Sequence, residues 1–191
     1  MTNRIKEIFS QSIKTKQDLL MDEQVLIKIK AVVELSVKCL NSGGKILFCG
    51  NGGSAADAQH IAAELSGRFY LDRPPLYAEA LHVNSSFLTA VANDYSFDQI
   101  YARMVEAAGK DGDILVGLST SGNSKNVLEA LKTAKALGLK TVTLTGSSKG
   151  AVDQFSDLTI KVPSQDTPRV QECHITIGHI LCELIEKEMF G

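Results

Sequence analysis

The chain has 191 residues, of which 44% are hydrophobic and 22% are charged, and its formal net charge is −2. These values fit one folded domain and exclude a wholly disordered chain. The balance of 20 basic and 22 acidic residues also argues against a nucleic-acid binder that works through a broad basic surface, although it leaves room for a local anion site.

No apolar run is long enough to cross a membrane, and the polar, amphipathic start of the chain, Met1–Lys16, lacks the apolar core of a signal peptide. We therefore expect a cytoplasmic protein with no membrane partner. The four cysteines form no CxxC pair, so we expect reduced structural thiols rather than a zinc knuckle or a disulfide. They are Cys39, Cys49, Cys173 and Cys182.

In chain order, two helices are predicted first, over 2–20 and 22–42. A short apolar run at 45–49, followed by Gly-Asn-Gly-Gly, predicts a buried strand and a turn, after which Ser54 is expected to cap a helix over 54–67. The alternation of strands and helices beyond this point predicts a parallel sheet covered by helices on both faces. Further strands are expected at 76–83, 113–118, 140–145 and 158–162, and further helices at 84–92, 97–108, 124–137 and 168–189.

Two segments repeat the order of strand, small polar loop and helix, namely 44–54 and 112–124. Ligands of open α/β sheets bind at the carboxyl ends of the strands, where both loops would lie. The second loop, Ser119-Thr-Ser-Gly-Asn-Ser124, places four hydroxyls and a glycine directly before a helix. Unpaired N–H groups at a helix start attract anions, so the loop is either a phosphate site or an ordinary serine-rich turn with a capping serine. It has no Walker lysine, and neither loop has the GxGxxG pattern of dinucleotide sites.

Polar residues recur at helical spacing in two places. Asp57, His60 and Glu64 are expected on one side of their helix, opposite an apolar side, and His179 lies on the polar side of the last helix. The simplest interpretation is a pair of solvated faces, while His and Glu four residues apart also suit metal binding or proton transfer. If both faces are functional, an interface between subunits would bring them together, which predicts an oligomer. His174 falls at the edge of the apolar stripe and is expected to be structural.

At this point a family resemblance becomes visible. The segments NGGSAADAQHIAAELSGR (51–68), ANDYSF (92–97), LSTSGNS (118–124) and RVQECH (169–174), together with His179, resemble the phosphoheptose isomerase branch of the sugar isomerase (SIS) family. The similarity is clearest from Gly43 to Phe190. It implies one SIS domain over 1–191, with a helical extension at 1–42 that packs on a three-layer, flavodoxin-like α/β core at 43–191 and in the oligomer.

The resemblance also implies a site and an activity. The family converts D-sedoheptulose 7-phosphate to D-glycero-D-manno-heptose 7-phosphate, for lipopolysaccharide core or other surface polysaccharide, as a homotetramer with one zinc per subunit and active sites between chains. By position, Glu64 and His179 would be the acid–base pair, and His60, Glu64, Gln171 and His179 would hold the zinc. The residues that would touch substrate are Asn51, Gly52, Gly53, Ser54, Glu64, Asn93, Asp94, Ser119, Thr120, Ser121, Ser124 and Gln171.

The residue types suit a ketose–aldose interconversion, in which a proton moves between C1 and C2 through an enediol. We assign Glu64 as base and His179 as acid, and the reverse assignment stays open. One geometric difficulty remains, because Gln171 and His179 lie about 12 Å apart along a helix and roughly 80° around it. Leaning side chains, a distorted helix or two different chains would each resolve it.

Three other functions are compatible with parts of the pattern. A related SIS tetramer binds the bacterial replication initiator protein without catalysis, but that branch lacks the acidic residue at position 64 and the second histidine. Another SIS isomerase would act on a pentose or hexose phosphate, and a SIS sensor module would have no activity. Pro168 departs from the family pattern, in which some members carry an acidic residue there.

Overall fold

The computed structural model describes all 191 residues and contains one sheet of five parallel strands in the order β2-β1-β3-β4-β5. This is the strand order of flavodoxin-like doubly wound folds, and it reverses between β1 and β3. The parallel α/β architecture predicted from the sequence is therefore confirmed. The strands are β1 (Ile46–Gly50), β2 (Ala78–Ala80), β3 (Ile114–Ser119), β4 (Lys140–Thr145) and β5 (Leu158–Lys161).

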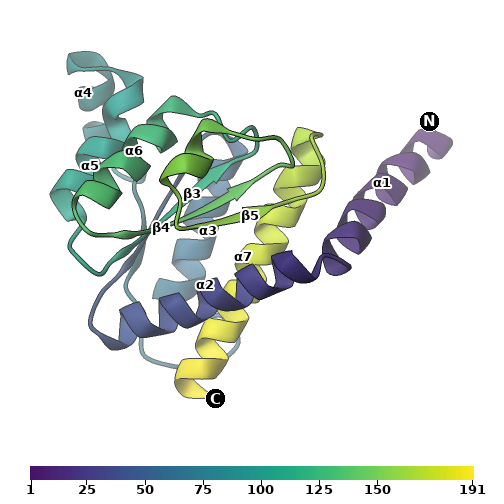
Figure 1. Ribbon diagram of the computed structural model, residues 1–191, viewed down its shortest axis with the longest axis horizontal. Coiled ribbons are helices and arrows are strands. Elements are labelled where there is room, and N and C mark those ends of the chain that lie inside the picture. Colours follow the sequence, from purple (N-terminus) through teal and green to yellow (C-terminus); the bar gives the residue numbers. More distant parts are fainter.

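Helices cover both faces of this sheet (Figure 1). Because side chains alternate along a strand, Ile46 and Phe48 enter a core of 28 buried residues on one face, and Leu47 and Cys49 enter a core of 14 on the other. The larger core is closed by α2 (Glu23–Asn41), α3 (Gly53–Ser66) and α7 (Thr167–Phe190). The smaller core is closed by α4 (Ser85–Asp94), α5 (Ile100–Ala108) and α6 (Lys125–Ala136).

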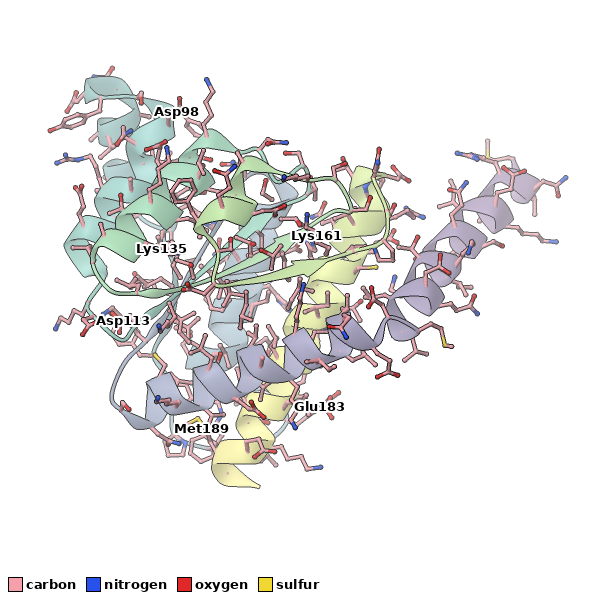
Figure 2. All side chains as sticks on the ribbon, in the orientation of Figure 1. Asp98, Asp113, Lys135, Lys161, Glu183 and Met189 are labelled. Atoms are coloured by element: carbon pink, nitrogen blue, oxygen red, sulfur yellow. The ribbon has the colours of Figure 1, made fainter.

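The first helix, α1 (Thr2–Leu20), confirms the predicted span but stands apart from this body. It extends away from the sheet in Figure 1, and Figure 2 shows its side chains standing free around the amino-terminal half. Only Thr15 and Leu19 of this helix are buried. Five large apolar side chains of α1 are exposed instead, which are Ile5, Ile8, Phe9, Ile13 and Leu20.

Two local predictions are corrected. Ser54 does not cap α3, because Gly52, with a φ of 56°, occupies the cap position and the helix begins at Gly53. The strand expected at 76–83 shrinks to Ala78–Ala80, an edge strand paired only with β1, since the chain soon turns toward α4, whose cap is the Asn84 side chain accepting from the N–H of Phe87. Short 3₁₀ turns, η1 (Phe97–Gln99) and η2 (Ala151–Phe155), precede α5 and β5.

The four cysteines are free and buried, as expected for structural thiols. Burial raises the pKa of Cys49 and Cys182 to about 12, so neither forms a thiolate near neutral pH. No helix of the structure is both long and apolar enough to cross a membrane.

Candidate active site

The loop between β3 and α6 forms a hydroxyl-lined turn at the carboxyl end of the sheet. Gly122 has a φ of 68°, and a Cβ there would lie 3.0 Å from the Cα of Gly150, so this position requires glycine. The carbonyl of Gly122 accepts from the N–H of Val152 at 3.1 Å, which ties the loop to the segment after β4. The Oγ atoms of Ser119 and Ser124 lie 2.9 Å apart. The turn is therefore fixed by its contacts with the segment that follows β4.

This rigid turn leads directly into α6, for which Ser124 is the cap residue. The N–H groups of the first helical turn have no partners further back in the helix, and they carry partial positive charge. Beside them stand the hydroxyls of Ser119, Thr120, Ser121 and Ser124. The arrangement suits a phosphate dianion, and phosphate binding at these residues stays a prediction.

The loop between β1 and α3 lies at the neighbouring strand end and receives a side chain from α7. A Cβ on Gly53 would lie 2.1 Å from Nε2 of Gln171, so only glycine lets the amide rest against the helix start. Gly52 and Gly53 are exposed, whereas Ser54 is buried. The structure therefore brings together Gln171 and the predicted Asn51–Ser54 segment.

Further along, α3 and α7 approach each other closely. A Cβ on Gly178 would lie 2.4 Å from Cδ1 of Ile61, so the glycine permits this contact. The neighbouring histidines meet as a result, with Nε2 of His60 and Nε2 of His179 3.0 Å apart. Oε1 of Glu64 lies 3.5 Å from Nε2 of His60. The two polar faces thus meet within one chain, and the histidine pair does not need the subunit interface that the sequence suggested.

This group has the donor atoms of a metal site but does not complete one. Tetrahedral zinc ligands with bonds of about 2.1 Å lie about 3.4 Å apart, which is close to both distances from His60. At such spacing one ring donates to the other, or both present lone pairs to a shared cation. No closed group of three His, Cys, Asp or Glu side chains with metal-binding geometry is formed. His60, His179 and Glu64 thus fit zinc in chemistry and spacing, and further ligation has to come from elsewhere.

Gln171 makes no hydrogen bond to the two histidines in this chain. It lies against Gly53, whereas His179 lies against His60, so the two face different levels of α3. The difficulty predicted from their spacing is therefore real. Between these levels lies Asp57, which is buried rather than on the expected solvated face. Burial raises the pKa of Asp57, against the opposing effects of Gln171, His60 and His179.

A hollow connects this region with solvent. It has a volume of about 310 Å³, enough for part of a small sugar phosphate. Its lining is mostly polar and combines one residue of α3 with the start of α7. The lining residues are Asp57, Pro168, Gln171, Glu172 and Ile175.

Asn93 and Asp94 lie on the helix that follows β2, the strand next to β1 in the sheet. They end α4 on the exposed surface, where Nδ2 of Asn93 donates to Oδ1 of Asp94 at 2.9 Å. No hydrogen bond of this chain joins them to either candidate ligand loop. Their predicted contact with substrate stays a prediction.

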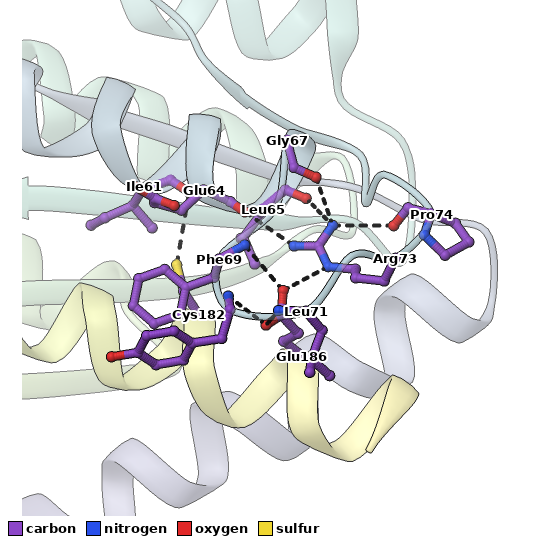
Figure 3. Close-up of polar contacts among 11 residues, drawn as sticks. Ile61, Glu64, Leu65, Gly67, Phe69, Leu71, Arg73, Pro74, Cys182 and Glu186 are labelled. Atoms are coloured by element: carbon purple, nitrogen blue, oxygen red, sulfur yellow. Dashed lines mark hydrogen bonds and ion pairs between the residues drawn. The ribbon is translucent and has the colours of Figure 1, made fainter.

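The sequence did not identify Arg73 and Glu186, which form a buried ion pair at the end of α3 (Figure 3). The Glu186 carboxylate accepts from the N–H groups of residues 69–71 and from Nε of Arg73 at 3.0 Å. Arg73 in turn donates to four carbonyls, including that of Glu64 at 3.0 Å. Burial alone would raise the pKa of Glu186, but these hydrogen bonds outweigh it and lower the pKa. The pair fixes the end of the helix that carries His60 and Glu64.

Comparison with known proteins adds to this geometry. The family model described as SIS domain matches residues 8–146. A phosphoheptose isomerase of Clostridium acetobutylicum is 50% identical over 191 residues, which is 100% of this chain and 97% of that protein. The structures of phosphoheptose isomerases from Neisseria gonorrhoeae and Francisella tularensis are similar, with TM-scores of 0.91 and 0.93 and identities of 42% and 39%. Each comparison covers 97% of this chain and 98% of the other.

Proposed function

Because the chain belongs to the phosphoheptose isomerases of the SIS family, we propose that it interconverts D-sedoheptulose 7-phosphate and D-glycero-D-manno-heptose 7-phosphate. It is an aldose–ketose isomerase, and its product begins the synthesis of nucleotide-activated heptose. The observation that carries this proposal is the meeting of Glu64, His60 and His179, of which His60 and Glu64 lie on the helix that begins at one of the two ligand loops. The initiator-binding alternative is not favoured, because the relatives at about 50% identity are named phosphoheptose isomerases.

Different residues act on the phosphate, the reacting carbons and the sugar hydroxyls of the substrate. The hydroxyls of the β3–α6 loop and the start of α6 anchor the phosphate, which converts a diffusing sugar into a positioned one. The Glu64 carboxylate has no hydrogen-bond donor of its own besides the nearby His60, so its lone pairs are free to take the proton from C1 or C2. Glu64 returns that proton to the other carbon, while His179 donates a proton to the carbonyl oxygen and takes one back from the neighbouring hydroxyl, so both side chains end as they began. Gln171 and Asn51 supply amide contacts to the sugar hydroxyls.

Zinc forms the second part of the proposal. We assign one zinc ion per subunit to His60, Glu64 and His179, with Gln171 completing the set. When bound, zinc would act as a Lewis acid that steadies negative charge on the sugar oxygens. Because Gln171 lies away from the histidines in its own chain, a neighbouring chain is the natural source of this ligand or of the movement that delivers it.

The third part of the proposal is a homotetramer with active sites between subunits, in which residues of neighbouring chains complete each site. The exposed apolar side chains of α1 support it, since monomeric proteins rarely leave such a row uncovered. We assign Asn93 and Asp94, at the exposed end of α4, to the substrate as well. We also propose a cytoplasmic location, with no nucleic-acid or membrane partner, which fits the net charge of −2.

The direct test is turnover of sedoheptulose 7-phosphate by the purified protein, beside pentose and hexose phosphates. Glu64→Gln should lower kcat by about 10²- to 10⁴-fold, because the amide cannot accept the proton. Stability should change little, since Glu64 is partly exposed. The proposal is overturned if folded wild-type protein, supplied with zinc, does not turn over sedoheptulose 7-phosphate. If it turns over only a pentose or hexose phosphate, that shorter sugar is the substrate instead.

Metal content tests the zinc assignment separately. We expect about one zinc per subunit in the wild type by elemental analysis, and much less in His60→Ala after the same dialysis, because the site loses a nitrogen ligand. His82→Ala is the matched control, since this histidine lies after β2 and outside the proposed set. Equal zinc in all three proteins, or none in an active wild type, would contradict the assignment.

A further inference from the structure

The side chains of Asn51 and Asn126 form a reciprocal amide pair. Nδ2 of Asn51 donates to Oδ1 of Asn126 at 2.8 Å, and Nδ2 of Asn126 donates to Oδ1 of Asn51 at 2.8 Å. Asn51 directly follows β1, and Asn126 lies in the first turn of α6, just beyond the hydroxyl loop. The pair therefore bridges the two candidate ligand loops at the point where the strand order reverses.

Asn126 is held so that its amide can have only one orientation. Its side chain is buried, and Oδ1 also accepts from the N–H of Val127 at 2.9 Å. Oδ1 is therefore the acceptor of two N–H groups, and Nδ2 must point at Asn51. A buried amide is costly unless it is hydrogen-bonded, so this geometry resists rearrangement.

The β1–α3 loop, which carries Asn51, is also held by a residue of α5. The hydroxyl of Tyr101, on α5, donates to the carbonyl of Gly50, the residue before Asn51. Tyr101 is itself buried, with 2% of its surface exposed. The β1–α3 loop is thus fixed from α5 through its backbone and from α6 through the Asn51 side chain.

We propose that Asn126 is a positioning residue, which sets the placement of the Asn51–Ser54 loop relative to the phosphate-binding loop. This inference rests on the proposed function, in which one substrate spans both loops. Asn51 keeps one N–H and one lone pair for the sugar, and Asn126 decides where they point. The phosphate is anchored on the same helix that carries Asn126, so the pair fixes the distance from the anchor to the sugar contacts.

Breaking the hydrogen bonds between Asn51 and Asn126 should affect phosphate binding and sugar placement differently. Phosphate binding uses the hydroxyl loop and α6, which keep their own contacts without Asn51. Sugar placement depends on both loops, and a displacement of about 1 Å near reacting groups can cost on the order of a hundredfold in rate. A defect of the pair should therefore affect the sugar phosphate much more than inorganic phosphate.

The sharpest test is Asn126→Asp, which preserves shape and removes one donor. The ionised carboxylate cannot donate to Oδ1 of Asn51, whereas the protonated carboxyl can donate and accept as the amide does. We expect kcat/KM for sedoheptulose 7-phosphate, relative to wild type at each pH, to be about 10- to 100-fold lower near pH 8. It should recover toward about pH 5, because burial raises the pKa of the introduced carboxyl.

Two further measurements separate positioning from a folding defect. The inhibition constant of inorganic phosphate should change less than about threefold in the neutral variant Asn126→Ala, which breaks the pair without adding a charge beside the phosphate-binding start of α6. Asn41→Asp, which adds the same charge at the exposed end of α2, should match the wild type at every pH. If Asn126→Asp does not fold, Asn51→Asp breaks the same pair from the less buried side and should give the same pH-dependent loss.

The outcomes distinguish the two proposals. A wild type without heptose turnover overturns the proposed function, whatever the variants do. With an active wild type, two results overturn the positioning role alone. One is a relative kcat/KM of Asn126→Asp that is unchanged or is lowered equally at all pH values, and the other is a kcat/KM of Asn126→Ala that falls in parallel with its phosphate affinity. Recovery at low pH, with phosphate inhibition preserved, supports it.

Discussion

Two polar clusters lie along the contact between α3 and α7, and they are built in opposite ways. At the carboxyl end, the side chains of Arg73 and Glu186 are each 2% exposed, and their polar atoms are occupied by the backbone and by each other. Near the middle, His60 is 48% exposed and Glu64 26% exposed, and their ring and carboxylate atoms have few partners. Similar residue types thus serve a structural role in one place and remain available for chemistry in the other.

The difference shows what a buried ion pair requires. Exchanging such pairs for apolar residues is often harmless, because desolvation cancels much of the Coulomb attraction. Here that exchange would fail, because Arg73 also satisfies four carbonyls and Glu186 satisfies three N–H groups. Removing both side chains would leave these backbone groups, five of them part-buried, without their hydrogen-bond partners. The pair is therefore an anchor for the segment after α3 more than an electrostatic contact.

The largest expected effect on stability follows from breaking this anchor. Glu186→Gln should lower the free energy of unfolding by about 3–5 kcal/mol, because it leaves the Arg73 charge buried without a counterion. The exposed Glu183 on the same helix provides the matched control, and Glu183→Gln should change it by less than about 0.5 kcal/mol. Urea unfolding of both variants checks this. Equal shifts in the two would show that the anchor adds little and that the two clusters are alike.

The contrast between the clusters also marks what the sequence could predict. The hydroxyl loop before α6 and the helical spacing of His60 and Glu64 are local patterns, and the strand alternation determines which sheet edge they occupy. Arg73 and Glu186 are separated by 113 residues, and Asn51 and Asn126 by 75. No periodicity connects such pairs, because their contact depends on the strand order and on how closely α3 and α7 pack.

The same limit applies to the meeting of the two histidines. Helical spacing assigned each to a polar face, but the close approach depends on Gly178 against Ile61, a contact between distant segments. Asp57 was placed on a solvated face for the same reason, since a helix has no exposed side until its neighbour is known. The family resemblance, rather than any local pattern, predicted that His60, Glu64 and His179 belong to one site. Gln171, the fourth residue of that set, makes no hydrogen bond to the two histidines in the single chain.

A further histidine of α7, His174, lies in the buried interior rather than on this polar face, and it extends the comparison to a buried polar group. It lies on α7, is 0% exposed, and neither ring nitrogen has a hydrogen-bond partner. The expectation that it is structural agrees with this position. Burial lowers its pKa from 6.5 to about 4, so the ring is neutral in the folded protein at neutral pH.

This pKa shift predicts a smaller, pH-dependent effect. Between about pH 6.5 and pH 4 the unfolded chain binds a proton at His174 that the folded chain does not, so stability is full above this range and is lost as the pH falls through it. The loss should reach about 3 kcal/mol by pH 4. His174→Leu should make the free energy of unfolding depend less on pH in this range, as measured by urea unfolding at several pH values. Some pH dependence should remain from His82, because burial lowers its pKa as well. An unchanged slope in the variant would mean that the folded protein accommodates the charged ring, and His174 would then belong with the accessible cluster rather than with the core.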